Sequence, residues 1–414
     1  MKPQSALARL ATLLLITTLM LSGFAVAAAG ETVTLTVWGD PDNQAVLEDC
    51  FAEINKAFEA KYPDIKLDYQ WSGSFDGVNV AMQSDSLPDL FWVQGNKSSK
   101  MAEMALAGYL LPFDQFNPDK SRFPQQAIEY SLVEGVTYCT YPCFLDYALV
   151  YYNADMFEKY GLAKPTTFEE FVKAMETLKQ NGEIPVAFGG GSEWDRYWPV
   201  QVMGTSLADG DLERIKLGDK SGDYPQILEV FKYFQDFIKA GYFGDHPASM
   251  DGASAQLAFS NGKAGMIFDG TWNSNLYKQL PFKIGSFAMP NHEGVRYAQS
   301  GFSNFNTYAI SAKTKYPEQA FAYASFLGSQ EAQQIMANHL ASIPVISDIV
   351  VSDPLVDEFS DFGKVGNNIY HVLSNVQSGG RPQDIFHANV LGDLMTGATT
   401  PEAGVAAITE EMNK

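Results

Sequence analysis

The sequence predicts an α/β protein built as two lobes that are joined by several crossings of the chain. Two kinds of segment alternate along the chain, as expected for an α/β fold. In one kind, apolar residues recur with a period of two, as in strands; in the other, they recur at helical spacing. At roughly 150 residues per domain, the length of 414 residues suggests two or three folding units. The sequence contains no internal repeat and no low-complexity linker. The units are therefore not expected to be independent domains that follow one another along the chain.

The first elements predict a parallel sheet. Thr alternates with apolar residues over 32–38, and two further strands are expected at 65–71 and 90–93. Between the first two strands, Asp40 and Asp42 supply the capping side chains for an amphipathic helix. This order of elements implies parallel strands whose carboxyl ends share one edge, and open sheets of this kind bind ligands at that edge.

The remaining elements continue the alternation of strands and helices. Thr166-Thr167-Phe168-Glu169 is typical of a capping box, and the helix that it opens is expected to run to Gly182. Short apolar runs mark the strands, and apolar residues at helical spacing mark the helices. Further strands are expected at 136–141, 148–152, 184–188, 264–268 and 307–311, and further helices at 224–240, 317–328 and 330–338.

Residues 1–29 carry the pattern of a cleaved secretory signal peptide. A basic start precedes an apolar core at 10–21, and the small residues at 25–29 suit a signal peptidase. The apolar core is short for a membrane span, although an uncleaved anchor helix is the alternative. Phe24 stands where a lipoprotein would need its cysteine. We therefore expect an unlipidated, monomeric protein in the periplasm.

Composition and charge exclude several classes of function. The 28 basic and 49 acidic residues give a formal net charge of −21, and the sequence has no basic run to bind nucleic acid or an anionic membrane. Five histidines and three cysteines leave little material for a metal cluster or a disulfide scaffold. We therefore expect no nucleic-acid partner, no metal and no cofactor.

The three cysteines would meet an oxidising compartment if the chain is exported. Cys139 and Cys143 flank a Thr-Tyr-Pro segment, and a turn at Pro142 would bring them together into a disulfide. If the segment stays extended, its four residues span about 13 Å, which is too far for a disulfide bond. The sequence leaves both arrangements open. Cys50, on the apolar face of the first helix, is expected to be a buried thiol.

The motifs that would carry catalysis are incomplete. The glycines at 189–191 lack the Lys-Ser/Thr of a phosphate-binding loop, and they indicate a turn between a strand and a helix. Neither a Gly-x-Ser-x-Gly elbow nor a His-Glu-x-x-His pair occurs in the sequence. The segment from Asp40 begins like a calcium loop but has Ala45 and Phe51 where glycine and glutamate are needed. We therefore do not expect an enzyme. A pair of carboxylates for glycoside hydrolysis stays an open alternative, because the spacing of such a pair is defined in three dimensions and not along the sequence.

Aromatic residues stand beside short polar residues at the ends of the predicted strands. A flat aromatic ring covers the apolar C–H face of a pyranose, and a carboxylate or amide binds its hydroxyl groups. A phosphate or carboxylate ligand would instead need convergent arginines. A single tryptophan would indicate core packing, but five at successive strand ends favour a binding face for a neutral sugar. The groups are Trp38 to Asn43, Trp71-Ser72, Trp92 to Asn96, Asp146-Tyr147, Glu193-Trp194 and Trp272-Asn273.

A series of short motifs runs along nearly the whole chain. They are Val37-Trp38, Phe58 to Ile65, Leu87 to Phe91, Gly108 to Pro112, Val150 to Asn153 with Phe157 and Lys159, Pro165 to Glu170, Phe259 to Met266 and Asp269 to Trp272. In this order, they resemble extracellular solute-binding protein family 1 of carbohydrate ABC importers, the maltose-binding-protein-like family.

The resemblance implies a periplasmic-binding-protein-like fold of two α/β lobes around a central ligand cleft, with multiple hinge crossings. It assigns residues 30–146 and about 273–330 to lobe 1, and residues 147–272 and about 331–414 to lobe 2. The implied function is to capture a mono- or oligosaccharide in the cleft and to deliver it to an ABC permease in the inner membrane.

The resemblance also implicates individual side chains in the sugar site. Arg381 and Phe386 lie in the C-terminal region that closes over the sugar in this family, whereas the match at Trp198-Pro199 could be packing. Together with the aromatic residues at strand ends, the candidate substrate-binding residues are Asp40, Asp42, Asn43, Trp71, Trp92, Gln94, Asn96, Asp146, Glu193, Trp194, Trp272, Asn273, Arg381 and Phe386.

Three other functions stay open. An acidic and aromatic pocket also suits a polyamine, through cation–π contacts and carboxylates, so a polyamine-binding ABC transporter component is the nearest alternative. A secreted glycan-active enzyme is the alternative from another class. A sensory partner of a chemoreceptor would share the same fold and cleft.

Overall fold

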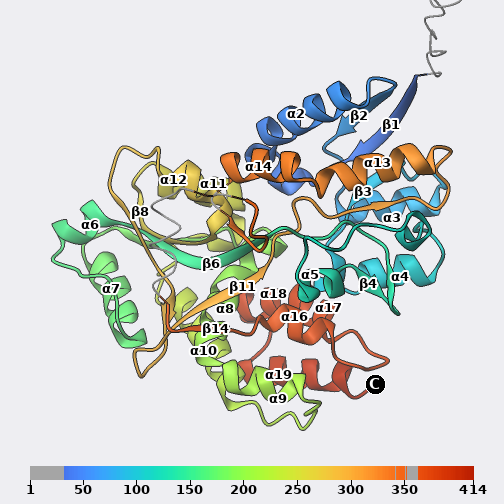
Figure 1. The fold of residues 1–414 in the computed structure, drawn as a ribbon. Helices are drawn as coiled ribbons and strands as arrows, with labels where there is room; N and C mark the ends of the chain where they lie inside the picture. Colours follow the sequence, from blue (N-terminus) through green and yellow to red (C-terminus); the bar gives the residue numbers. More distant parts are fainter. Residues whose placement is uncertain (1–31, 341, 350, 352–361) are drawn as a thin grey trace, which may run out of the picture.

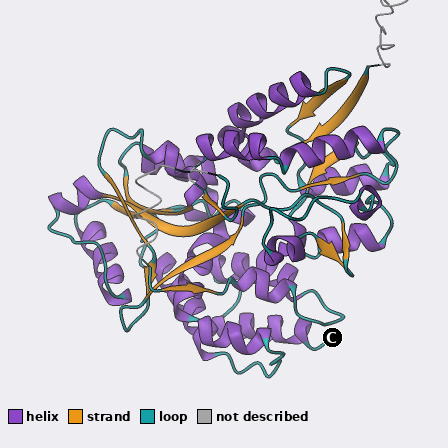
Figure 2. Ribbon diagram, in the orientation of Figure 1, coloured by secondary structure: helices purple, strands orange, loops and turns teal. Residues whose placement is uncertain are grey.

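The computed structural model describes residues 32–340, 342–349, 351 and 362–414 (Figure 1). The predicted signal peptide at 1–29 lies outside the described residues. Two large sheets organise the chain, and helices pack around both of them (Figure 2). We call the sheet near the N-terminus, with its helices, lobe 1, and the second sheet, with its helices, lobe 2. In the described ranges, no helix combines the length and the apolar character that crossing a membrane requires.

Lobe 1 contains a four-stranded sheet in the order β12-β3-β1-β2. Its strands are β1 (Val33–Trp38), β2 (Ile65–Gln70), β3 (Leu90–Trp92) and β12 (Tyr308–Ile310). β1 pairs in parallel with β2 on one side and with β3 on the other. The predicted parallel arrangement of the first three strands is therefore confirmed, and β12 adds an antiparallel edge.

Helices cover this sheet, and the longest of them follows β1 as the sequence predicts. The face of that helix that points into the core carries Leu47, Cys50, Phe51, Ile54 and Phe58. The helices of lobe 1 are α2 (Gln44–Lys61), α3 (Phe75–Gln83), α4 (Lys100–Leu106), α5 (Gln125–Tyr130), α13 (Pro317–Leu327) and α14 (Gln330–His339). Its short elements are η1 (Pro41–Asn43), η2 (Gly95–Lys97), η3 (Phe113–Phe116), β4 (Leu132–Val133) and β5 (Val136–Thr137).

Lobe 2 contains an eight-stranded sheet around β6 (Phe144–Asn153). The other strands are β7 (Ile184–Ala187), β8 (Ala264–Gly270), β9 (Ile284–Phe287), β10 (Met289–Pro290), β11 (Arg296–Phe302), β13 (Ile343–Pro344) and β14 (Lys364–Gly366). β6 pairs antiparallel with β8, β9, β11 and β13. Val150 faces one core cluster, and its neighbours Leu149 and Tyr151 face the other, which explains the apolar run in the sequence of this strand.

The helices of lobe 2 lie against both faces of this sheet and continue to the C-terminus (Figure 1). They are α6 (Ala154–Lys159), α7 (Phe168–Gln180), α8 (Glu193–Leu207), α9 (Asp209–Lys216), α10 (Pro225–Lys239), α11 (Gly252–Ser260), α12 (Ser274–Tyr277), α16 (Ile369–Ser374), α17 (Pro382–Asp384), α18 (Leu391–Thr396) and α19 (Pro401–Met412). The short elements are η4 (Pro247–Ser249), η5 (Thr271–Asn273) and the π-helical turn η6 (Ile385–Val390).

The capping box of α7 lies one residue later than predicted. The Thr167 hydroxyl accepts a hydrogen bond from the backbone N–H of Glu170 at 3.2 Å. In return, the Glu170 carboxylate accepts one from the backbone N–H of Thr166 at 2.8 Å. Both residues of the Thr-Thr pair can act as a cap, so the sequence pattern alone does not distinguish the two registers.

Two other predictions in this region need correction. The strand expected at 136–141 is reduced to the hairpin strand β5, because the chain then turns towards β12 and makes only an isolated bridge at Cys139. Cys139 and Cys143 are free thiols, so the disulfide alternative is wrong for this structure. Cys143 instead packs beside Asn306, whose side-chain N–H lies 3.0 Å from its sulfur. Burial raises the pKa of the Cys139 thiol to about 12.

Two segments lie in a different lobe from the one expected above. Residues 284–302 form β9, β10 and β11 and extend the sheet of lobe 2. α14 instead packs on α2 of lobe 1, where the His339 side chain lies 3.0 Å from Glu53. β9 and β11 belong to lobe 2 because they pair with β6, and α14 belongs to lobe 1 because it packs on α2.

Candidate functional site

A cleft with a volume of about 540 Å³ lies between the two lobes. The carboxyl ends of β1, β3 and β8 and the amino end of α8 meet at this cleft, as expected for the ligand edge of an open sheet. The predicted site residues that line it are Asp40, Asp42, Asn43, Trp92, Gln94, Asp146, Trp194, Trp272 and Asn273.

Asp40 organises the turn that follows β1. Its carboxylate accepts hydrogen bonds from the backbone N–H of Asp42 at 3.0 Å and from the Asn43 side chain at 2.6 Å. The Asp40 side chain is buried, and this burial raises its pKa to about 6. Asp40 therefore holds Asp42 and Asn43 at the edge of the cleft, where both are available to a ligand.

Replacing Asp40 with asparagine is expected to remove part of the pH dependence of folding. Because the pKa of Asp40 is raised in the folded protein, its contribution to the free energy of unfolding is fully present below about pH 4 and is lost as the pH rises to about 6. The variant should therefore gain stability relative to the natural protein across this interval, as measured by denaturant unfolding. Asp64→Asn at an exposed site is the control. Parallel stability curves for Asp40→Asn and the natural protein would contradict the raised pKa.

Aromatic rings line the cleft where the two lobes meet. The Trp272 ring lies 5.6 Å from the Trp198 ring and 6.2 Å from the Phe305 ring, measured between centroids. We call these three residues the Trp272 cluster. The indole N–H of Trp92, close to them, donates a hydrogen bond to the Asn304 carbonyl at 2.9 Å. Trp198 is thus a lining residue and not only a packing residue.

A second group of aromatic residues, from lobe 2, lines another part of the cleft. The Trp194 and Tyr370 rings lie 5.2 Å apart, and Tyr197 lies 5.9 Å from Tyr370. His387 packs among them, at 4.4 Å from the Trp194 ring. We call these four residues the Trp194 cluster, of which His387 alone does not line the cleft. Glu193 does not line the cleft, because its carboxylate is hydrogen-bonded to His387 at 2.7 Å.

Asp269 is a fully bonded carboxylate in the wall of the cleft. It accepts hydrogen bonds from the backbone N–H of Gly270 at 2.7 Å, from the Asn273 side chain at 2.9 Å and from the Tyr277 hydroxyl. Burial raises its pKa to about 6. The amide of Asn273, which the sequence analysis expected to contact the ligand, therefore also fixes this carboxylate.

The cleft also contains a lysine that the sequence analysis did not select. Lys97, at the end of η2, lines the cleft, and burial lowers its pKa to about 8 against the attraction of Asp146. Asp146 is buried, and its carboxylate accepts a hydrogen bond from the Ser342 hydroxyl. Burial raises the pKa of Asp146, and the positive charge of Lys97 opposes that rise.

Two carboxylates face each other across the cleft. Asp42 belongs to lobe 1, and Asp195 belongs to α8 of lobe 2. Burial raises the pKa of Asp195, and the negative charge of Asp42 contributes to this rise. Asp195 and Lys97 directly follow the selected residues Trp194 and Asn96, and Asp269 directly follows a predicted strand just before Trp272, so all three could have been considered from the sequence.

Besides Glu193, four further predicted site residues lie outside the cleft lining: Trp71, Asn96, Arg381 and Phe386. Trp71 packs on Tyr69 in lobe 1, with the ring centroids 5.2 Å apart. Phe386 is a core residue that stacks on Phe231 at 6.2 Å, because the turn η6 points it into lobe 2. Arg381 is largely exposed and pairs with Asp384 at 3.4 Å. The sugar-closing role expected for Phe386 and Arg381 is therefore not supported by their positions.

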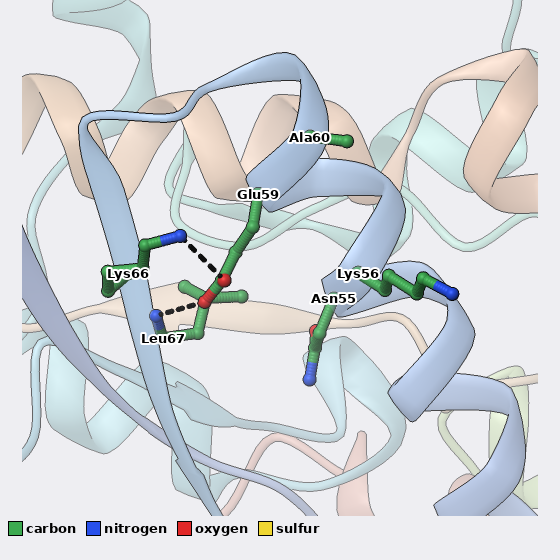
Figure 3. Close-up of a pocket in the computed structure, with 6 residues that line it drawn as sticks. All are labelled: Asn55, Lys56, Glu59, Ala60, Lys66 and Leu67. Carbon is green, nitrogen blue, oxygen red and sulfur yellow. Dashed lines mark hydrogen bonds and ion pairs between the residues drawn. The ribbon is translucent and has the colours of Figure 1, made fainter.

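A second hollow lies on the outer surface of lobe 1, between α2 and β2 (Figure 3). Inside it, the Glu59 carboxylate accepts hydrogen bonds from the Lys66 ammonium at 3.0 Å and from the backbone N–H of Leu67 at 2.9 Å. The other lining residues are Asn55, Lys56 and Ala60. The lining contains no aromatic ring to cover the face of a sugar, so this hollow is not a candidate for sugar binding. Within the part of the chain that the structure describes, no group of three His, Cys, Asp or Glu residues is placed to hold a metal ion.

Two α/β lobes around a ligand-sized cleft define a two-lobed solute-binding protein. The family model of bacterial extracellular solute-binding proteins matches residues 44–334, and the chain belongs to this family. The uncharacterized ABC transporter extracellular-binding protein PH1214 of Pyrococcus horikoshii is 26% identical to it over 381 residues, which covers 88% of this chain and 84% of that relative.

Solved structures confirm the fold. A chitin oligosaccharide binding protein superposes with a TM-score of 0.76 at 22% identity, over 92% of this chain and 98% of that one. The solute-binding protein RafE in complex with raffinose superposes with a TM-score of 0.72 at 20% identity, over 92% of this chain and 99% of that one. The predicted two-lobed fold and the predicted family are therefore confirmed.

Proposed function

We propose that this protein is the substrate-binding component of an ABC importer and captures a neutral oligosaccharide in the cleft between its lobes. The observation that carries the proposal is that aromatic rings and carboxylates from both lobes line one cleft. Rings cover the apolar faces of pyranoses, and carboxylates accept hydrogen bonds from their hydroxyl groups. The structural relatives include proteins whose names specify chitin oligosaccharides and raffinose, which supports a sugar as the ligand.

The two separate aromatic clusters favour an oligosaccharide over a monosaccharide. The Trp272 cluster lies where the lobes meet, and the Trp194 cluster lies on lobe 2. One pyranose ring has two faces of limited area, so rings in two places suit a ligand with more than one sugar unit. Asp42 and Asp195 line the same cleft from opposite lobes and are suited to bind its hydroxyl groups from both sides.

The cleft also supplies a mechanism for delivery to a permease. A sugar that contacts Asp42 and Trp92 of lobe 1 and Trp194 of lobe 2 gains all these contacts only when the lobes are closed. The ligand therefore shifts the population towards the closed form, which we propose is the form that an inner-membrane permease recognises. Export to the periplasm by the predicted signal peptide belongs to this proposal, since the family is described as extracellular.

Intrinsic fluorescence tests the proposal directly. The tryptophans of the cleft should change their emission when the purified protein is titrated with the right ligand, and the panel should contain mono- and oligosaccharides and the polyamines putrescine and spermidine. We expect a saturable change with at least one oligosaccharide. A response to polyamines alone would overturn the proposal in favour of an amine-binding component.

The acidic lining is the one observation that favours a polyamine. Asp40, Asp42, Asp146, Asp195 and Asp269 line the cleft, and Lys97 is the lysine among its lining residues. Binding of a polyamine to carboxylates is expected to weaken strongly between about 10 mM and 150 mM salt, because ionic attraction is screened over this range. Binding of a neutral sugar should be insensitive to the same change.

Incubation with the bound oligosaccharide followed by product analysis would reveal a glycan-active enzyme, which this proposal excludes.

A further inference from the structure

We propose that His387 is a positioning residue that holds Trp194 in its orientation in the cleft through a hydrogen bond to Glu193. Nothing in the sequence analysis selected His387, and it does not line the cleft itself. The consequence for ligand affinity rests on the proposed function, but the orientation of Trp194 can be measured without any ligand.

The hydrogen bond has a defined direction. His387 Nδ1 lies 2.7 Å from Glu193 Oε1, and an ionised carboxylate only accepts hydrogen bonds, so Nδ1 donates. This hydrogen bond lowers the pKa of Glu193 and keeps its carboxylate ionised. His387 has only 4% of its surface exposed, whereas Glu193 is about half-exposed and is the first residue of α8. The pair therefore connects the start of α8 to the C-terminal region of the chain.

The imidazole lies among the three aromatic rings that line this part of the cleft. Its centroid is 4.4 Å from the Trp194 ring, 5.2 Å from the Tyr370 ring and 5.6 Å from the Tyr197 ring. All three of these rings line the cleft. A change in the imidazole position would therefore move the surface that a sugar would contact, although His387 itself would not touch the sugar.

The backbone gives His387 little freedom to move. It lies in the π-helical turn η6, next to Phe386, which is fully buried and stacked on Phe231 with an interplanar angle of 10°. Turns of this kind inside helices are frequent at functional sites. Because Phe386 is fixed in the core, the following residue points towards the Trp194 cluster.

The other ring nitrogen indicates that packing alone does not explain a histidine here. His387 Nε2 is buried and has no hydrogen-bond partner in the described ranges. A buried polar atom without a partner costs free energy, and a leucine of similar size would avoid this cost. The histidine is therefore explained by the bond that its other nitrogen makes to Glu193.

The titratable groups that face His387 are Glu193 and Tyr197 of α8 and Tyr370 of α16. Arg196 acts on the charge of Glu193, and Asp384 of α17 acts on Tyr370. Because the imidazole packs against the Trp194 ring, acrylamide quenching of the tryptophan emission reports whether this contact is kept.

The first test uses the ligand-free protein. We expect His387→Leu to increase the quenching of tryptophan emission by acrylamide, because the hydrogen bond to Glu193 that holds the Trp194 ring in place is lost. The increase should be absent when the variant also carries Trp194→Phe. Glu193→Ala breaks the pair at a half-exposed residue and should increase quenching by acrylamide, as His387→Leu does. Emission and quenching identical to the natural protein in both variants would overturn the proposal.

His387→Asn is the conservative variant, because its amide N–H lies near the position of Nδ1 and can still donate to Glu193. It should keep the low acrylamide quenching of the natural protein. The control is His339→Leu, which breaks a similar pair with Glu53 (3.0 Å) outside the cleft. If His387→Leu fails to fold, Glu193→Ala and His387→Asn still decide the outcome.

The second test measures ligand affinity by calorimetry with raffinose, stachyose and chitotriose as probes. We expect His387→Leu and Glu193→Ala to weaken the binding of the responding sugar about tenfold, with His387→Asn close to the natural protein. Unchanged affinity in the first two variants would overturn the role in the cleft. If the natural protein binds none of the probes, the proposed function fails, and the ligand-free measurements still decide the positioning role.

Discussion

Phe386→Ala is expected to lower the free energy of unfolding by about 3–5 kcal/mol, because it removes a fully buried ring and leaves a cavity in lobe 2. The ring stacks on Phe231 at 6.2 Å and belongs to the main core cluster of lobe 2. Denaturant unfolding at constant pH measures the loss. Any loss of ligand affinity at a temperature where the variant is folded should be no larger than that of His387→Leu, since Phe386 does not line the cleft and acts on it only through its neighbour His387.

Phe116→Ala is the matched control for this substitution. Its ring also stacks on another phenylalanine, Phe321, at 4.5 Å, but it lies partly exposed on lobe 1. We expect it to cost about 1 kcal/mol or less, because the site can be reached by water. A Phe386→Ala variant of full stability that had lost its ligand affinity would contradict the structure and would restore the role expected for Phe386 at the mouth of the sugar site.

Trp272→Ala is expected to weaken sugar binding by at least about 1 kcal/mol, which is about a fivefold loss of affinity. The indole lines the cleft and contacts Trp198 and Phe305, so its removal takes away both a sugar-covering face and the support of its neighbours. Calorimetric titration with the oligosaccharide found by fluorescence measures the change.

Trp71→Ala separates this effect from the general loss of an indole. Trp71 packs on Tyr69 and Phe51 in lobe 1, with ring distances of 5.2 Å and 6.0 Å, and does not line the cleft. We expect it to lower stability and to leave sugar affinity within twofold of the natural protein. Unchanged affinity in Trp272→Ala, or an equal loss in both variants, would rule out a specific role for Trp272.

The order of strands and helices could be predicted from the sequence wherever one face of an element is buried and the other is exposed. α2 and α10 have this pattern; a helix was predicted in both places, and the range of 224–240 predicted for the second agrees closely with α10. α8 has no such pattern, because it is buried along most of its length and contains Pro199. Proline removes one hydrogen bond of the helix, and the segment therefore gives a weak helical signal although tertiary packing holds it.

The site could be predicted at strand ends but not inside turns. Trp92 ends β3 and Trp272 follows β8, and the rule that ligands bind at the carboxyl ends of strands places both in the cleft. Phe386 and His387 are neighbours in one turn, and successive residues of a helix differ in direction by about 100°. The sequence does not specify which of the two points to the core, so Phe386 was selected and His387 was missed.

The course of β6 has a consequence for the cooperativity of unfolding. Its first residue, Phe144, is packed in the core of lobe 1, while Val150 and Tyr151 of the same strand lie in the two core clusters of lobe 2. A single rigid segment is thus shared by both hydrophobic cores, so neither core can be completed by a fragment that ends before this strand. We expect the two lobes to melt in one calorimetric transition, and a chain cut at β6 to yield no independently folded half.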